Sequence, residues 1–447
     1  MNISKEKGGQ NIRTHTNPTK IKHDSADFSG GCLKLYIDNW HRLDPPKSIL
    51  KIIHGARIPF SQVPPLIFPT AEVMLKYQTP MSSLMSVEIQ KMIQSQVLEP
   101  APLTPSFISP LFIICKSNGK SRVIFNLKAL NRYTKPKSFN LFTHYRMPTF
   151  LQDRDWMGKL DLSQAYYHIP IRRKHRCYLR VSYEGQMYQM TCLPFGLSAA
   201  PRIFAAVTNW TAEMLRKKGL RLVVYLDDYL IVHQSKAILS SHMKTAISFL
   251  TSLGWCVNLD KSVIIPTRRI DFLGITWDSE LNTKSLPPEK ISKIGQCLST
   301  RLAAGSWTLK QAQCLLGYLN FAAFITHRGR LHCRCLQSHS NLLRRTPLAS
   351  IPYPHMVKME LKWWLNNLDQ VTPIHQRTLS TNYVITDASD IKWGAMVNNK
   401  MMCGAWTRQQ NHWHCNAKEM YAVIAAISFR AHVLKNSTVI LQSDNKT

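Results

Sequence analysis

The sequence predicts an α+β fold divided into several domains. At 447 residues the chain is long enough for two or three domains, each with its own core. Short runs rich in Val, Ile, Leu and Tyr, such as residues 222–232, predict strands buried on both faces. Longer stretches, such as residues 82–98, carry apolar side chains at helical spacing. A final strand–helix–strand pattern between residues 383 and 445 predicts a separate α/β part.

The charge of the chain predicts a polyanionic partner. Lys and Arg number 57 against 26 Asp and Glu, which gives a formal net charge of +31. Because the basic residues run along the whole chain, nucleic acid is a better partner than a membrane surface. The sequence shows no signal peptide and no apolar run of about 18 residues, so we expect an intracellular protein of the cytoplasm or nucleus with no membrane partner.

Eleven cysteines form no repeating framework, and we expect them to be free thiols in a reducing compartment. Two short clusters, residues 332–335 and 412–415, combine His with Cys and suggest zinc as an alternative. Neither cluster has a second Cys/His pair at zinc-finger spacing, so zinc is the weaker interpretation.

The most informative stretch is residues 224–232, in which Asp227 and Asp228 stand between two apolar runs. Two residues between strands is hairpin spacing, yet Asp-Asp is not a preferred two-residue turn. Adjacent carboxylates about 4 Å apart repel by roughly 1–4 kcal/mol, depending on exposure to water. A divalent cation relieves this repulsion, and oxygen ligands suit Mg²⁺. Taken alone, such a pair is more often a solvated acidic turn, and the cation site depends on the partners described below.

Upstream of this stretch the sequence predicts a cationic hairpin. Residues 109–116 and 121–127 are its strands, and Asn118-Gly119 is the turn signal. Lys116, Lys120 and Arg122 gather at its tip. The hairpin is either a solubilising turn or a clamp for a triphosphate, whose oxygens bind Lys and Arg.

Between the hairpin and the Asp pair lie a third acid and a Pro/Gly turn. Asp161 ends a strand, on the face opposite Leu160 and Leu162, and Tyr166 follows shortly after it. Residues 190–204 then predict a turn containing Phe195 and Gly196, which opens a helix capped near Ser198 with Pro201 in its first turn.

The order of these motifs resembles that of reverse transcriptases. The resemblance runs from Ser109 to about Ile275, with further motifs on both sides, and five motifs in one order are specific. Residues 253–262, with Asn258 and Lys261-Ser262, are similar to the fourth palm motif, and residues 272–275 to the primer-grip hairpin. The resemblance implies a right-hand polymerase with fingers, palm and thumb.

Several segments are most similar to DIRS-type retrotransposon polymerases, with Ty3-type elements the nearest alternative. These segments are Trp40, residues 54–60, residues 126–131 and residues 193–202. The chain shows neither an Asp-Ser/Thr-Gly protease motif nor an integrase zinc pattern, which agrees with the first assignment.

The resemblance also implies roles for the candidate residues. Asp161 and Asp227 would hold two Mg²⁺ ions, for which Mn²⁺ can substitute, with Asp228 and the carbonyl of Leu162 in support. Lys261 is either a proton donor to pyrophosphate or a solvated lysine. The residues expected around the dNTP are Lys116, Lys120, Arg122, Tyr166, Phe195 and Gly196. Among these, Tyr166 occupies the position of the steric gate and predicts selection of dNTPs over NTPs.

The C-terminal part resembles a ribonuclease H. Asp387 and Asp444 end strands and Glu419 opens a helix, which matches three of that family's carboxylates. We expect a partial ribonuclease H module of weak or no activity; an ordinary α/β segment with scattered surface acids is the alternative. Before it, residues 286–345 have helical spacing, with Thr308 as a candidate N-cap, and suit a thumb.

The predicted protein is thus an RNA-directed DNA polymerase that binds RNA template, DNA primer, RNA–DNA hybrid and dNTPs; its oligomeric state is left open. The main alternative is a catalytically silent retroelement remnant that binds nucleic acid. The predicted parts are a disordered basic arm (1–30), an extension and linker (31–85), fingers and palm (86–280), a helical thumb and connection (281–375) and a partial ribonuclease H-like domain (380–447).

Overall fold

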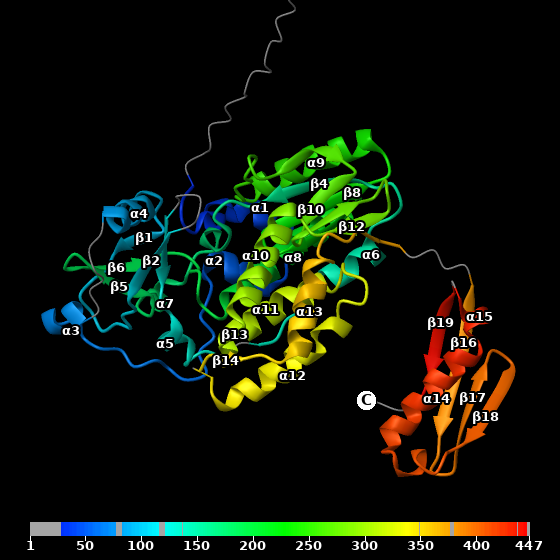
Figure 1. The fold of residues 1–447 in the computed structure, drawn as a ribbon. Helices are drawn as coiled ribbons and strands as arrows, with labels where there is room; N and C mark the ends of the chain where they lie inside the picture. The colour runs from blue at the N-terminus through cyan, green and yellow to red at the C-terminus, as the bar shows by residue number, and fades with distance from the viewer. Residues whose placement is uncertain are drawn as a thin grey trace, which may run out of the picture. The chain divides into compact units, whose positions relative to one another are not determined.

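The computed structural model describes residues 28–76, 83–115, 121–135, 137–347, 349–375, 380–435 and 437–444. The side chains of Cys115, Ser121 and Arg122 are outside this description. The chain divides into two compact units, the first ending at Leu281 but also including Pro287–Lys290, the second formed by the rest. Figure 1 shows the helices and strands coloured in chain order. Most of the predicted N-terminal arm lies outside the described residues. Within the described part, each helix is too short or too polar to span a membrane.

The first unit begins with short helices that pack on its core. The doublet Pro45-Pro46 separates two of them, as predicted, because Pro46 is the residue before α2. The elements up to the first sheet are η1 (Cys32–Tyr36), α1 (Ile37–His41), α2 (Lys47–Gly55), α3 (Ala71–Lys76) and α4 (Ser83–Gln94). The prediction that α4 continues to Leu98 is wrong. Gln96 takes a positive φ of 53°, and Leu98 enters a strand opposite Met190.

Two small antiparallel sheets follow. The predicted cationic hairpin is present as β2 (Leu111–Cys115) and β3 (Ser121–Phe125), and its turn lies outside the described residues. The other sheet has the order β1-β6-β5. Its strands are β1 (Leu98–Pro100), β5 (Arg180–Tyr183) and β6 (Gln186–Met190). The short helices in this stretch of the chain are α5 (Lys128–Asn131), η2 (His144–Arg146), α6 (Met147–Phe150) and α7 (Arg173–Arg176).

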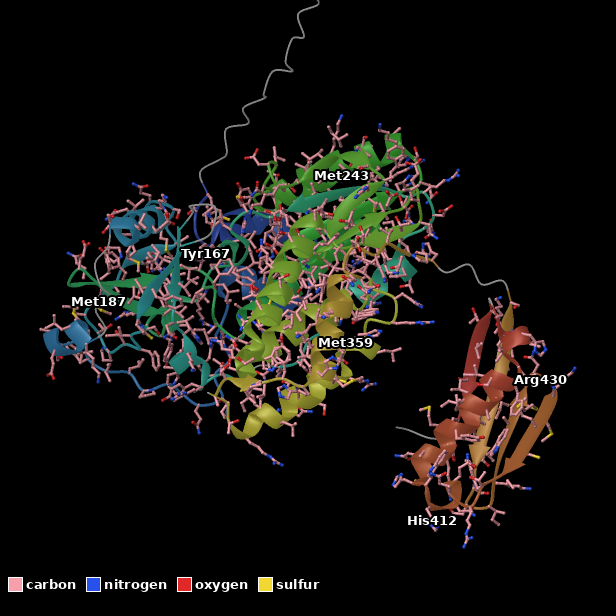
Figure 2. The ribbon with its side chains drawn as sticks, viewed as in Figure 1. Tyr167, Met187, Met243, Met359, His412 and Arg430 are labelled. Atoms are coloured by element: carbon pink, nitrogen blue, oxygen red, sulfur yellow. The ribbon has the colours of Figure 1, made fainter. Side chains whose placement is uncertain are left out.

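The central sheet of the first unit is antiparallel with the order β7-β8-β4-β9. Its elements are β4 (Trp156–Asp161), η3 (Ala165–His168), α8 (Ala200–Lys217), β7 (Arg221–Tyr225), β8 (Asp228–His233), α9 (Lys236–Ser252) and β9 (Val263–Thr267). Helix α9 packs on β4, β8 and β9, and α8 packs on β7. Tyr229–Val232 are fully buried, as the apolar run predicts, and so is Met243 on α9 (Figure 2).

Three local predictions have different outcomes in this region. Pro201 does lie in the first turn of α8, but Ser198 is not its cap, because the N-cap is Ala199 and the Ser198 hydroxyl bonds to Thr134 instead. The turn after β7 is Leu226-Asp227 rather than Asp227-Asp228. The predicted hairpin at 272–275 is confirmed as β10 (Arg269–Phe272) and β11 (Ile275–Asp278).

The second unit contains a helical part and a separate small sheet. Thr308 caps α11 in a capping box with Gln311, as predicted. The helical part comprises β12 (Thr283–Ser285), α10 (Pro288–Ala304, of which Pro288–Lys290 belong to the first unit), β13 (Ser306–Trp307), α11 (Leu309–Ala322), η4 (Leu331–Cys333), α12 (Arg334–Leu342), η5 (Leu343–Arg345), β14 (Ile351–Pro352), α13 (His355–Leu365) and β15 (Thr372–Pro373).

The small sheet has the order β18-β17-β16-β19, in which β16 and β19 are parallel. Helix α14 packs on β16 and β17 over a core that includes Val384, Trp393 and Trp406. The predicted helix over 417–434 begins earlier and divides at Arg430. The elements are β16 (Thr381–Ala388), β17 (Lys392–Val397), β18 (Lys400–Ala405), η6 (Gln410–His412), α14 (Cys415–Phe429), α15 (Ala431–Leu434) and β19 (Thr438–Gln442).

Candidate active site

The end of the central sheet brings three acidic residues close together along the backbone, although their carboxylate oxygens are not one of the groups within 4.8 Å found among the described residues. Strand β4 ends at Asp161 and β8 begins at Asp228, and these two residues are partners in the antiparallel register. Asp227 precedes Asp228 in the two-residue turn, where Leu226 takes a φ of 53°. A left-handed conformation is costly for a leucine and is a feature that functional sites retain. Asp161 and Asp228 therefore lie on neighbouring strands, and Asp227 lies in the turn next to Asp228.

The backbone around Asp161 is held by the loop that resembles a fourth palm motif. The amide of Asn258 donates to the Asp161 carbonyl at 2.8 Å. The Ser262 hydroxyl accepts from the Asp161 amide at 3.0 Å and donates to the Asn258 carbonyl at 2.6 Å. The Leu162 amide donates to the Asp227 carbonyl at 3.1 Å. These bonds hold the backbone at Asp161 and Asp227, from which the two carboxylates project.

The electrostatics of the group match a cation site. The pKa of Asp228 is raised from 3.8 to about 6, chiefly by burial and also by the charges of Asp227 and Asp161, while Lys159 and Lys261 oppose the shift. Negative charge is thus concentrated where water is partly excluded. A donor set made only of oxygens fits a hard divalent cation.

Lys261 itself is exposed. Its backbone amide donates to Asn258 Oδ1 at 3.3 Å, so the loop that holds Asp161 also places Lys261. Its ammonium acts on Asp228 through its charge, which agrees with a position near the carboxylates. Its predicted role as a proton donor stays a prediction.

The residues predicted to surround a nucleotide partly converge. Tyr166, in η3, packs against two aromatic rings. The centroid of its ring lies 4.8 Å from that of Phe195 and 5.0 Å from that of Phe204, which it meets edge-to-face. The two preceding residues, Gln164 and Ala165, both have positive φ, which makes a tight turn directly after the Asp161 strand. Tyr166 and Phe195 therefore form one aromatic surface.

Gly196 lies where the turn approaches the fingers hairpin. Its φ is +90°, and a Cβ there would lie 3.2 Å from the carbonyl oxygen of Phe125 at the end of β3. Both the conformation and the approach favour glycine. The turn thus joins the hairpin to the aromatic surface.

Asn131 is a site residue that the sequence pattern did not single out. Its amide group donates to the Gly196 carbonyl at 2.9 Å and accepts from the Ser198 amide at 2.8 Å, so it clamps both sides of the turn. In the sequence, Asn131 is the last residue of the segment 126–131, which contributed only to the comparison of retrotransposon subfamilies. Its function could not be predicted because its partners lie more than sixty positions away.

The cationic tip of the hairpin falls largely outside the described residues. Lys116 and Lys120 are both in the part of the chain that is not described. Arg122 lies on β3 opposite Ile114, but its side chain is not described. Their predicted contacts to a triphosphate stay predictions.

The small sheet carries a second acidic group. One carboxylate oxygen each of Asp387, Glu419 and Asp444 lies within 4.8 Å of the others. Glu419 Oε1 accepts from the Ala388 amide at 3.3 Å, whereas its buried Oε2 has no hydrogen-bond partner among the described residues. Burial and the charge of Asp444 raise the pKa of Glu419. An unpartnered buried oxygen beside two carboxylates fits a divalent cation.

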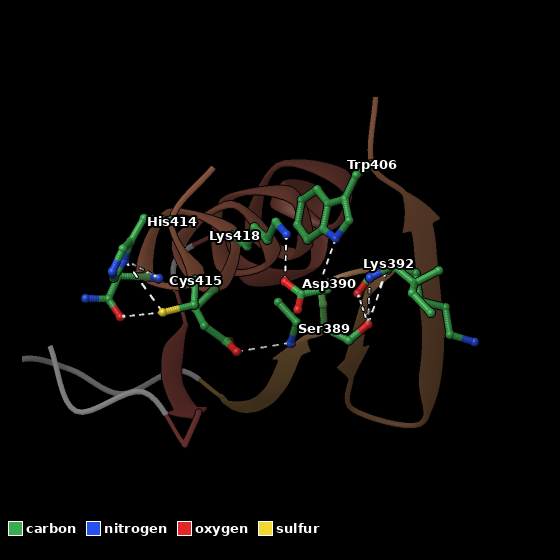
Figure 3. A network of polar contacts seen from close by, with 11 residues as sticks. Ser389, Asp390, Lys392, Trp406, His414, Cys415 and Lys418 are labelled. Carbon is green, nitrogen blue, oxygen red and sulfur yellow. Dashed lines mark hydrogen bonds and ion pairs between the residues drawn. The ribbon is translucent and has the colours of Figure 1, made fainter. Parts of the chain in front are cut away.

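The first turn of α14 is anchored beside this group (Figure 3). Lys418 is buried and pairs with Asp390 at 2.9 Å, and its ammonium lies over the ring of Trp406. Trp406 Nε1 donates to the Ser389 carbonyl at 2.8 Å. The residue before Glu419 is therefore tied to the loop after β16, which positions Glu419 near Asp387.

The two zinc candidates do not form metal-binding groups among the described residues. His332 stacks on Trp363 at 3.7 Å, and Cys333 is buried. In the other cluster, His414 Nδ1 accepts from the Asn416 amide and caps α14. These side chains have structural contacts instead.

Comparison with known proteins agrees with this geometry. Residues 114–277 match the family model of reverse transcriptase (RNA-dependent DNA polymerase). The chain contains a reverse transcriptase domain. That matched segment includes Asp161, Asp227 and Asp228, and it ends within β11.

Curated relatives place this domain among those of retroelements. The chain is 23% identical over 380 residues to the enzymatic polyprotein of cauliflower mosaic virus, covering 80% of the chain and 53% of that polyprotein. It is also 23% identical over 353 residues to the transposon Tf2-3 polyprotein of Schizosaccharomyces pombe, covering 73% of the chain and 24% of that polyprotein. The chain thus spans about half the length of the viral polyprotein.

Solved structures show the same fold around the reverse transcriptase domain. The foamy viral protease-reverse transcriptase dRH in complex with double-stranded DNA aligns with a TM-score of 0.57 over 96% of this chain and 76% of that one, at 16% identity. The foamy viral protease-reverse transcriptase in complex with an RNA/DNA hybrid aligns with a TM-score of 0.58 over 92% of this chain and 57% of that one, also at 16% identity. The right-hand polymerase fold predicted from sequence is therefore confirmed.

Proposed function

We propose that this chain is an RNA-directed DNA polymerase that extends a DNA primer with dNTPs. The observation that carries the proposal is the pairing of Asp161 with Asp228 at the end of the central sheet, with Asp227 in the adjoining turn. The match of residues 114–277 to reverse transcriptases supports it. RNA template, DNA primer and their hybrid are the proposed partners, by analogy with the nucleic-acid complexes of the foamy viral protein.

In this proposal Asp161 and Asp227 hold two Mg²⁺ ions, with Mn²⁺ able to replace them, and Asp228 supports the site. When bound, such ions stabilise the attacking and leaving oxygens of an in-line displacement. The Asn258–Ser262 loop holds Asp161 in place, and Leu162 and Asp227 fix one another through the backbone. Asn131 keeps the Phe195-Gly196 turn in position under the nucleotide.

Nucleotide selection is assigned to the aromatic surface and the hairpin. The Tyr166 ring, fixed by Phe195 and Phe204, would clash with a ribose 2′-hydroxyl and so favour dNTPs. Lys116, Lys120 and Arg122 are the proposed triphosphate contacts, since Lys and Arg bind phosphate oxygens.

Primer extension on an RNA template with dNTPs and Mg²⁺ tests the proposal. Asp227→Asn should abolish extension and keep hybrid affinity near that of the unchanged protein. Asp153→Asn, an exposed acid elsewhere on the first unit, is the matched control and should extend normally. Tight hybrid binding without extension in the unchanged protein would favour the alternative, a catalytically silent remnant.

Binding itself should respond steeply to salt. If the net charge of +31 serves the phosphate backbone, hybrid affinity should fall by about 10³-fold or more between 50 and 200 mM salt. A filter-binding series at several salt concentrations measures the slope. A flat response would remove the phosphate-binding interpretation.

We further propose that Asp387, Glu419 and Asp444 form the site of a partial ribonuclease H-like module, with weak activity at most on the RNA strand of a hybrid. The convergence of their oxygens within 4.8 Å supports this. Cleavage of a labelled RNA strand in a hybrid, with Asp387→Asn as the inactive variant, tests it. Equal cleavage by both proteins would exclude this site.

The retrotransposon subfamily is also a proposal. We assign the domain to DIRS-type elements on Trp40 and the segments 54–60, 126–131 and 193–202, with Ty3-type elements as the alternative. The relatives found support a retroelement without separating the two.

A further inference from the structure

A second cluster of reactive side chains lies in the first unit, apart from the carboxylates. Cys32, His168 and Cys256 come from η1, η3 and the loop after α9, and one ligand atom of each lies within 4.8 Å of the others. Cys32 and His168 are buried, and Cys256 is partly exposed. The proposed polymerase chemistry uses none of the three.

The loop that carries Cys256 is held firmly by the N-terminal segment. Asn39 Nδ2 donates to the Ser252 carbonyl at 2.7 Å, and Trp40 Nε1 donates to the Leu253 carbonyl at 3.0 Å. The Cys32 thiol donates to the Gly254 carbonyl at 3.4 Å. These contacts place the sulfur atoms of Cys32 and Cys256 side by side.

The histidine in this cluster is oriented for a positioning role. Its Nδ1 bonds to the Ala165 carbonyl at 2.9 Å, and its Nε2 accepts from the Cys256 amide at 3.0 Å. With both ring nitrogens occupied, His168 has no free lone pair for a metal. A closed zinc site also needs a fourth ligand, and the group found among the described residues has three. The geometry favours thiol chemistry over metal binding.

The two thiols are unequal. The neighbouring Cys32 lowers the pKa of Cys256 to about 5. The neighbouring Cys256 and burial raise the pKa of Cys32. The more exposed sulfur, that of Cys256, is thus the one whose thiolate form is favoured. A thiolate is the nucleophile in thiol oxidation, and the buried Cys32 thiol lies next to it as a resolving partner.

We propose that Cys32 and Cys256 are an oxidation site at which a peroxide drives formation of a reversible disulfide. The Cys256 thiolate attacks one peroxide oxygen, and the O–O bond breaks. Hydroxide departs as the leaving group, and Cys256 becomes a sulfenic acid. The Cys32 thiol then attacks that sulfur, the S–O bond breaks, and water leaves with the Cys32 proton. Two electrons pass from the two sulfurs to the peroxide, and a dithiol reductant reverses the reaction.

The disulfide would link the N-terminal segment to the support of the carboxylates. The Cys256 carbonyl accepts from the Ser163 amide at 2.8 Å, and the next residue, Val257, bridges to Leu162. The bond would thus fasten η1 to the strand that continues from Asp161. The oxidation site itself does not depend on the proposed polymerase activity.

The test is a thiol map of the reduced full-length chain after brief treatment with stoichiometric hydrogen peroxide. Remaining thiols are alkylated, and the digest is analysed by mass spectrometry. The expected main product is a peptide pair linked through Cys32 and Cys256 that disappears on reduction. Before oxidation, iodoacetamide should label Cys256 faster than the exposed thiol of Cys314.

Variants sharpen the test. Cys32→Ser should slow the alkylation of Cys256 and leave its oxidation stalled at the sulfenic acid, whereas Cys314→Ser should change neither. Linkage mainly through other cysteines, or slower alkylation of Cys256 than of Cys314, would overturn the proposal. So would stoichiometric zinc in the reduced protein that is lost in Cys256→Ser, because it would make the cluster a metal site.

Discussion

Two groups of acidic residues stand out among the described residues, and their backbone support differs. At the first, Asp161 and Asp228 face each other across an antiparallel strand pair, beside residues such as Leu160 and Tyr229 that are fully buried. At the second, Asp387 and Asp444 come from a parallel strand pair, and a helix supplies the third acid. The same donor chemistry thus arises from two unrelated arrangements of strands.

The difference extends to charge. Lys159 and Lys261 oppose the raised pKa of Asp228, whereas the Ala388 amide is what opposes the raised pKa of Glu419. The first group lies over a large continuous core, and the second over a small one rich in alanine. The palm acids are therefore held by backbone bonds and tuned by lysines, while the C-terminal acids depend on the anchoring of one helix turn.

The largest expected effect separates the two groups functionally. Asp161→Asn should lower the rate of primer extension by at least about a hundredfold, since metal ligands contribute several kcal/mol to transition-state stabilisation. Hybrid cleavage should be unchanged in this variant, and Asp387→Asn should show the reverse pattern. Both activities are measured on one labelled hybrid. Loss of both activities in either variant would mean that the groups are coupled.

The aromatic surface distinguishes the palm group further. Tyr166→Ala should raise ribonucleotide incorporation relative to dNTP incorporation by about tenfold or more, because removing a steric clash changes discrimination by about 1–3 kcal/mol. Tyr166→Phe keeps the ring and is the matched control. Single-nucleotide extension with paired NTP and dNTP gives the ratio, and an unchanged ratio in Tyr166→Ala would leave this ring a purely structural role.

Asn131 offers a test of the turn beneath the proposed nucleotide site, which has no counterpart at the C-terminal acids. Asn131→Ala removes the bonds to the Gly196 carbonyl and the Ser198 amide and should lower the free energy of unfolding by about 1–2 kcal/mol. The KM for dNTP should rise as well. Urea denaturation and extension kinetics measure the two effects.

The matched control for this variant is Asn366→Ala, at an exposed position on the second unit, which should change neither quantity. An Asn131→Ala protein with unchanged stability and unchanged KM would show that the turn holds its shape without this clamp.

The smallest expected effect concerns pH and the ionisation of Asp228. Since its pKa is raised in the folded protein, from 3.8 to about 6, its contribution to stability is complete below the unfolded value and is lost as the pH rises through the folded value. Asp228→Asn removes this loss. At pH 7 with a chelator present, the free energy of unfolding of the variant should be about 1 kcal/mol higher than that of the unchanged protein. This value follows from about 1.4 kcal/mol for each pKa unit, reduced because the side chain is partly exposed to solvent.

Denaturation curves between about pH 4 and pH 7 provide the measurement. The advantage of Asp228→Asn should shrink towards the acid end, where both side chains are neutral. Glu419→Gln should also raise the free energy of unfolding at neutral pH, but by less than Asp228→Asn, because the Glu419 side chain as a whole is less buried. A variant that is less stable than the unchanged protein at neutral pH would show that Asp228 ionises without cost.

Much of the fold and of the carboxylate groups follows from local sequence. The apolar runs around Asp227 predict buried strands because every neighbour in such a run must leave water, and Tyr229–Val232 are fully buried. Thr308 and Gln311 predict a helix start because a capping box is completed within four residues. The turn at Leu226-Asp227 was displaced by one residue because strand register is set by the partner strand β4, not by turn propensity.

By itself, the sequence determined which acids the protein has, their order along the chain, the strands that carry them and the basic charge around them, because these depend on neighbours within a few positions. Only the tertiary structure decided that Ser262 and Asn258 hold Asp161, that Asn131 clamps Gly196, and that Cys32 meets Cys256. Each of these contacts joins segments that are distant along the chain. Hydrogen bonds and thiol pairs of that kind leave no periodicity or spacing in a sequence, since packing of the core alone brings their partners together.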